Sequence, residues 1–188
     1  MKINKIIITL FNIFILCASG LAEISDSIVD KYYEEMHTTD GTASINIGIN
    51  LSTEFPDASQ GELFAVLIDR ADKKQEDYSV LCNVLTYLIN KDPSFVWSAH
   101  LEKSLLALTK CPDVKVRAGL IRLLTMREKN KYQDLCIAFL DDPNDDVRNI
   151  AIPAVGYRAN GRNILKKYIQ DHDADPNYAK SVARAKKF

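Results

Sequence analysis

Residues 104–125 read SLLALTKCPDVKVRAGLIRLLT, and residues 135–156 read LCIAFLDDPNDDVRNIAIPAVG. Aligned with a shift of 31 residues, the two stretches match apolar with apolar positions along most of their length. The clearest matches in the turn and the second apolar segment are Pro112 with Pro143, Val116 with Val147 and Arg117 with Arg148. A period of this length, made of two apolar segments, predicts stacked helix pairs that bury a common core.

Apolar residues recur at helical spacing along the rest of the chain after residue 23. These stripes predict helices over 24–37, 60–71 and 76–90, and six more between Trp97 and the C-terminus. Asp or Asn beside Pro supplies an N-cap and a preset φ at several of the helix starts. Pro153 falls inside one predicted helix and is expected to kink it. The fold class predicted is therefore all-α.

One segment departs from the helical pattern. Residues 44–52, SINIGINLS, alternate polar and apolar side chains, which is typical of a strand. A lone strand cannot satisfy its backbone, so this reading needs a partner strand, which another chain could supply. The alternatives are a loop pinned by its isoleucines and a helix, because apolar residues also recur every fourth position from Ala43 to Phe55.

The first 22 residues have the form of a Sec signal peptide. Two lysines precede an apolar run from Ile6 to Leu16, and small residues follow as far as Ala22. Cleavage is expected after Ala22, with the mature protein periplasmic or secreted. The run is too short for a stable membrane span, which needs about 20 apolar residues. Lipidation at Cys17 is disfavoured, because the bulky Leu16 stands where a lipobox has a small residue.

Acidic and basic residues are unevenly distributed along the chain, although the net charge is close to zero. The formal net charge is −1, so no overall field recruits nucleic acid or an anionic membrane. Residues 23–60 hold eight acidic residues and one lysine, whereas residues 158–188 hold eight basic residues and three acids. This asymmetry is compatible with self-association or with a partner at the basic end. The expected parts are a signal peptide (1–22), an N-terminal helix with the acidic, alternating segment (23–59) and a helical repeat domain (60–188).

The helix, Asp/Pro turn, Val-Arg and second helix of these copies resemble the HEAT repeat, in its short bacterial, PBS-lyase-like form. The resemblance covers residues 60–188 and is strongest over 98–157. It implies an α-solenoid of about three to four helical hairpins.

The resemblance also implies roles for the residues of the turn. In the family, the turn acid and the Arg after Val link one repeat to the next, which implies this role for Asp113 with Arg117 and for Asp142 with Arg148. In the last copy Lys180-Ser181 stands near the Val-Arg position, a departure expected of a terminal capping repeat.

Residues suited to catalysis or metal binding are sparse. The three histidines are far apart in sequence and lack metal-ligand spacing. The acids between 141 and 146 surround a predicted helix N-terminus, where the helix dipole favours them. Residues 171–175 resemble the start of a calcium loop but lack its glycine and its bidentate glutamate, which favours a capping turn. No catalytic residue, metal or cofactor is predicted, and the chain is not expected to be an enzyme.

Three cysteines remain once the signal peptide is removed, so at most one disulfide can form within the chain. Cys82 and Cys136 lie on apolar stripes and are expected to be buried. Cys111 lies at a helix boundary and is expected to be the exposed thiol.

The predicted function is binding of another protein by an exported, non-catalytic scaffold or adaptor, because stacked helix pairs present an extended surface. One alternative is a periplasmic immunity protein that neutralises a toxin. Another, implied by the family resemblance, is a lyase-type enzyme or its accessory. Candidate contact residues are second-helix positions off the apolar stripe: Arg122, Tyr157 and Arg158, then Lys115 and Asn149.

Overall fold

The computed structural model describes residues 24–38, 50–51, 54–55, 57–74, 77–91, 95, 97–127 and 131–188. The predicted signal peptide and most of the alternating segment lie outside these residues. Of that segment, Asn50 and Leu51 are described, and both are helical.

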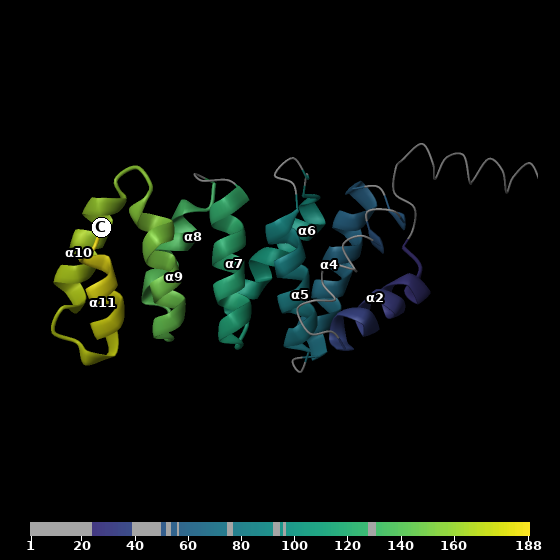
Figure 1. The fold of residues 1–188 in the computed structure, drawn as a ribbon, viewed down its shortest axis with the longest axis horizontal. Coiled ribbons are helices and arrows are strands. Elements are labelled where there is room, and N and C mark those ends of the chain that lie inside the picture. The colour runs from purple at the N-terminus through teal and green to yellow at the C-terminus, as the bar shows by residue number, and fades with distance from the viewer. Residues whose placement is uncertain are drawn as a thin grey trace, which may run out of the picture. The chain divides into compact units, whose positions relative to one another are not determined.

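The described residues form nine α-helices and no strand, which confirms the all-α prediction (Figure 1). Each predicted apolar stripe corresponds to one helix. The helices are α2 (Asp26–Thr38), α4 (Asp57–Lys74), α5 (Tyr78–Asn90), α6 (Ala99–Ala107), α7 (Val114–Arg127), α8 (Gln133–Ala138), α9 (Asp145–Gly156), α10 (Gly161–His172) and α11 (Ala179–Ala185). Three short 3₁₀ turns accompany them: η1 (Leu108–Lys110), η2 (Phe139–Asp141) and η3 (Pro176–Tyr178).

The chain divides into two compact units, which are described separately. The first comprises Met1–Tyr87 and Lys91–Leu106, and the second comprises Leu88–Asn90 and Ala107–Phe188.

In the first unit, a buried amide organises the packing around α4. Gln60, 1% exposed, donates hydrogen bonds through Nε2 to the carbonyl oxygens of Leu51 (3.3 Å) and Phe55 (2.7 Å). Its Oε1 accepts from the hydroxyl of Tyr87 (3.0 Å) and from Nζ of Lys91 (3.1 Å). Both N–H groups of the amide donate and its oxygen accepts twice, so its hydrogen-bonding groups are all satisfied. Leu51, one of the acceptors, is fully buried.

His100 joins the start of α6 to α4 in the same unit. Its Nδ1 lies 2.9 Å from Oε2 of Glu62, and its Nε2 lies 3.1 Å from Oδ2 of Asp69. These two hydrogen bonds raise the pKa of His100, although partial burial opposes the charged form. Burial acts to raise the pKa of Glu62, but hydrogen bonds from Ser98 and His100 outweigh it, and that pKa is lowered.

This arrangement predicts a pH dependence of stability. Because the folded-state pKa of His100 is raised, its contribution is fully present below the ordinary value of 6.5 and is lost as pH rises through the folded pKa. The urea midpoint of the protein should therefore fall more between pH 6 and pH 8 than that of the His100→Gln variant, which cannot titrate there. Equal changes in the two proteins would show that folding does not raise the pKa of His100.

In the second unit, α9 is the central helix. It packs against α7 and α8 and also against α10 and α11, and Figure 1 shows it between α7 and the α10–α11 pair. Val147, Ala151, Ile152 and Val155 of α9 are fully buried. The helix continues through Pro153 for one more turn to Gly156, so the proline does not end it.

The turn before α7 and the turn before α9 have the same backbone conformation, as their similar sequences predict. Cys111 has φ −57° and ψ 130°, and Asp142, 31 residues later, has φ −59° and ψ 138°. Asp113 Oδ1 then accepts a hydrogen bond from the amide of Val116 (2.9 Å), and Asn144 Oδ1 accepts from the amide of Asp146 (2.9 Å). Both side chains therefore cap the helix that follows.

The prediction that Cys111 is an exposed thiol is wrong. Its residue exposure is 2%, because the turn after η1 places it in the core, and its carbonyl oxygen accepts a hydrogen bond from Arg117 Nη1 (2.7 Å). Cys136 is fully buried, as predicted, whereas Cys82 is only partly buried. All three are thiols.

Candidate functional site

A buried ion pair joins α7 to the turn before α9. Arg117 donates from Nε to Asp142 Oδ2 (2.8 Å) and from Nη2 to Asp142 Oδ1 (2.9 Å). The two side chains are 9% and 5% exposed. The remaining nitrogen, Nη1, donates to the carbonyls of Cys111 and Pro112 (2.7 and 3.0 Å). A planar guanidinium is suited to this bidentate contact, so the pair ties α7 to the turn that precedes α9.

Arg148 makes the corresponding contact one repeat later. Its Nη1 donates to the carbonyl of Asp142 (2.7 Å), as Arg117 Nη1 does to Cys111. Its other nitrogens reach the carbonyl of Asn177 and the hydroxyl of Ser181 (3.3 Å). The guanidinium also lies 4.2 Å from the ring centroid of Tyr178, a cation–π contact. Arg148 thus links α9 to the last hairpin.

These contacts locate the residues that the repeat pattern singled out. Val116 and Val147 are fully buried in the core, and Pro112 and Pro143 are exposed in the turns. Asp113 caps its own helix, whereas Asp142 binds the arginine of the preceding helix. The alignment explains this difference, because Asp113 matches Asn144 and Asp142 matches Cys111.

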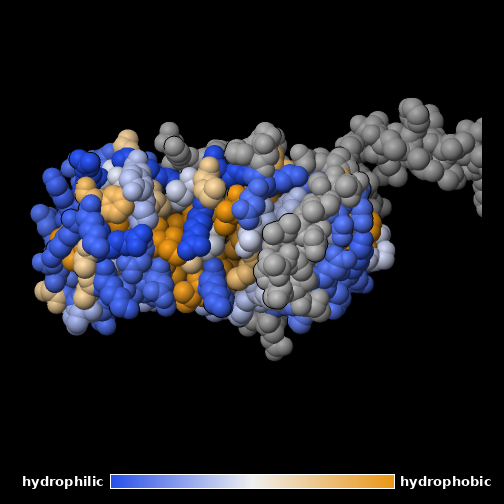
Figure 2. Space-filling model, in the orientation of Figure 1, coloured by the Kyte–Doolittle hydropathy of each residue, from blue (hydrophilic) through white to orange (hydrophobic). Residues whose placement is uncertain are grey.

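An open groove in the second unit is the candidate binding site. Its volume is about 390 Å³, and most of its lining is apolar. The residues that line it are Ile89, Arg122, Thr125, Met126, Ile150, Pro153, Ala154, Tyr157 and Arg184. Figure 2 shows apolar surface between α7 and α9, crossed by hydrophilic side chains. Among the described residues, Met126 (60% exposed) and Tyr157 (84% exposed) are the large apolar side chains most open to solvent.

A second, more polar hollow adjoins the groove and shares Ile150 and Arg184 with it. Its other lining residues are Asp146, Asn149, Lys180, Ala183 and Lys187. The two depressions form one continuous surface along α9 and α11, which we call the α9 groove.

Three of the five predicted contact residues lie on this surface. Arg122 and Tyr157 line the apolar part, and Asn149 lines the polar hollow. Arg158 is tied to its own helix, because its Nε donates to the carbonyl of Ala154 (2.7 Å), and it serves the structure of the turn. Lys115 is exposed in the first turn of α7 and lines neither depression.

Several residues of the groove, including Met126 and Arg184, were not predicted from the sequence. One signal was available on α9. Ile150, Pro153, Ala154 and Tyr157 stand at i, i+3, i+4 and i+7, which is a second apolar stripe beside the core stripe. A helix that is apolar on two faces contacts its own core with one and is available to a partner with the other.

The chain matches no protein-family model, no curated protein and no solved structure. Among the described residues, no helix is both long and apolar enough to cross a membrane. In the same part of the chain, no group of three or more His, Cys, Asp and Glu side chains is arranged to hold a metal ion.

Proposed function

We propose that this chain is an exported, non-catalytic protein-binding module, a HEAT-like scaffold or adaptor of the periplasm. The observation that carries the proposal is the α9 groove, where Met126 and Tyr157 present large apolar surfaces to water. Contiguous exposed apolar surface is unfavourable in isolation and marks sites at which another molecule docks. Tyr is also among the side chains that contribute most to protein interfaces.

The HEAT-like architecture is supported by the matching turns and by the two buried arginines, each of which contacts the hairpin that follows. Stacking of this kind leaves the second helices side by side, and α7, α9 and α11 supply most of the groove residues. Such a surface suits an extended partner, whereas a deep and dry pocket would suit a small substrate. Export is supported by the N-terminal sequence pattern alone.

Site-specific photo-crosslinking in exporting cells tests this function. A photoreactive residue in place of Met126 should capture one or a few defined proteins, because this side chain is 60% exposed in the groove. The control is the same residue in place of Lys166, an exposed position on α10 outside the groove lining. The mature chain recovered from the periplasm should begin at Glu23 by N-terminal sequencing.

Two results would contradict the proposal. Identical adducts from positions 126 and 166 would show that capture at the groove is not specific. Failure to find any adduct at position 126, with the protein present in the compartment, would argue against a docking role for the groove. A protein retained in the cytoplasm with Met1 at its N-terminus would refute export.

A further inference from the structure

We infer that the α9 groove binds an acidic segment of its partner, one that places apolar side chains against Met126 and Tyr157 and carboxylates against Arg122 and Arg184. This inference rests on the proposed protein-binding function and specifies the chemistry of the partner.

The floor of the groove requires apolar groups from the partner. Ile150, Pro153 and Ala154 of α9 line it with partly or fully buried side chains, and Met126 of α7 and Tyr157 line it with exposed ones. The Tyr157 ring contacts Phe188 edge-on, with 5.0 Å between centroids, and remains 84% exposed. A tyrosine side chain offers a large contact area at low cost in conformational entropy, because it has only two χ angles.

The rim of the groove requires negative charge from the partner. Arg122 and Arg184 line it, and within the described residues neither guanidinium makes a hydrogen bond or an ion pair with another side chain. Three other arginines of this unit are occupied: Arg117 and Arg148 make buried contacts, and Arg158 donates a hydrogen bond to the carbonyl of Ala154. Lys180 and Lys187 extend the basic rim along the adjoining hollow, where Asp146 is the acid among the lining residues.

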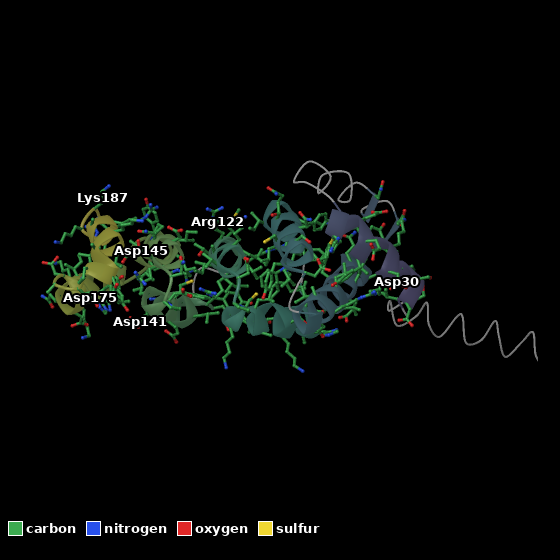
Figure 3. The ribbon with its side chains drawn as sticks, turned by 90° about the horizontal axis from the view of Figure 1, so that it is seen from below. Asp30, Arg122, Asp141, Asp145, Asp175 and Lys187 are labelled. Atoms are coloured by element: carbon green, nitrogen blue, oxygen red, sulfur yellow. The ribbon has the colours of Figure 1, made fainter. Side chains whose placement is uncertain are left out.

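Basic side chains line this surface: Arg122 and Arg184 in its apolar part, and Lys180 and Lys187 in the adjoining hollow. Figure 3 places Arg122 and Lys187 on one side of the unit and Asp141 and Asp175 toward the opposite side. A positive field on the groove side would steer an acidic partner and repel a basic one. The α9 groove therefore combines apolar contact area with complementary charge.

A peptide fits these features better than a nucleic acid does. A nucleic-acid site follows a chain of phosphates with many cations, whereas here a few cations border an apolar floor. The formal net charge of −1 also gives no general attraction to a polyanion.

Selection from a random peptide library displayed on phage tests the inference directly. The purified protein should enrich peptides that combine Asp or Glu with large apolar residues. By fluorescence anisotropy, the best of these peptides should bind Arg122→Glu/Arg184→Glu at least tenfold more weakly, because two attractive contacts become repulsive. Its affinity should also fall with added salt. The version of the peptide with Lys in place of each acid should bind this double variant better than it binds the wild type.

Two further variants serve as controls. One changes a charge outside the groove, and the other removes an apolar contact inside it. Arg162→Glu changes an exposed arginine in the first turn of α10, outside the groove lining, and should leave the affinity unchanged. Met126→Ala should weaken binding several-fold while hardly altering the thermal midpoint, because this side chain is largely exposed.

Several outcomes would overturn the inference. Enrichment of basic or uncharged peptides would do so, as would equal affinities for the wild type and Arg122→Glu/Arg184→Glu. Binding to phosphatidylglycerol vesicles that the double variant loses, without any peptide binding, would reassign the groove to an anionic lipid. A protein crosslinked at position 126 whose affinity is unaffected by the double variant would refute the acidic chemistry and leave the proposed function intact. Absence of both crosslinks and selected peptides would refute both.

Discussion

Replacing Asp142 by Ala is expected to lower the free energy of unfolding by about 3–5 kcal/mol, the cost of removing one partner from a buried ion pair. The change leaves the Arg117 guanidinium buried with two of its nitrogens unsatisfied, because Nε and Nη2 both donate to Asp142. The amide of Asn144, which donates to Asp142 Oδ1 (2.8 Å), loses its acceptor as well. Urea unfolding followed by circular dichroism measures the loss.

Asp113→Ala is the matched control, because Asp113 lies in the preceding turn and caps α7 without a side-chain link to Arg117. Loss of a cap alone should cost about 1 kcal/mol. Similar losses in the two variants would mean that the buried pair contributes no more than a cap does. The double variant Arg117→Met/Asp142→Leu should be more stable than Asp142→Ala, since it leaves no buried charge.

Gly161→Ala is expected to lower the free energy of unfolding by about 1–3 kcal/mol, the range for overpacking a tight site. A Cβ atom at Gly161 would overlap the carbonyl oxygen of Val155, and it would crowd the carbonyl carbon of Gly156 at 3.2 Å. These neighbours are backbone atoms, which cannot move aside as a flexible side chain can. The turn is also fixed by Asn160, which has a left-handed backbone with φ 61°.

Gly61→Ala is expected to have the opposite effect and to stabilise the protein. Gly61 lies inside α4, where a Cβ would find its nearest neighbour, Phe95, at an ordinary 3.8 Å. Alanine in a helix interior should therefore stabilise the protein by about 0.5–1 kcal/mol. Thermal unfolding of the two variants beside the wild type checks both signs. A neutral Gly161→Ala would show that the α9–α10 turn can relax.

Helix periodicity predicted the secondary structure well, because one face of each helix must be buried. The stripe Val116, Leu120, Leu123 and Leu124 is fully buried in α7. The partner of Arg117 was harder to foresee. The repeat alignment places Cys111 opposite Asp142, so the acceptor of this arginine has no counterpart in the preceding turn. A contact that spans 25 residues depends on how hairpins stack, which local patterns do not encode.

The candidate site was predicted only in part for a similar reason. Arg122 and Tyr157 were found because they lie off the core stripe of their helices. Arg158 also lies off the core stripe in the sequence, but its side chain donates a hydrogen bond to the carbonyl of Ala154 at the end of α9. Arg184 comes from a short and weakly apolar helix, and its place in the groove depends on the packing of α11 against α9.

The arginine links have a direction, and this bears on how the repeat could grow by gene duplication. Arg117 contacts the hairpin that follows it, Arg148 does the same, and Ser181 stands where the next arginine would be. A duplicated α8–α9 hairpin inserted beside the original would find an acceptor for each of its arginines. A hairpin appended behind α11 would meet Ser181, which has no guanidinium to offer. Insertion of a copy between α9 and α10 is therefore expected to preserve the arginine contacts, whereas addition after α11 is not.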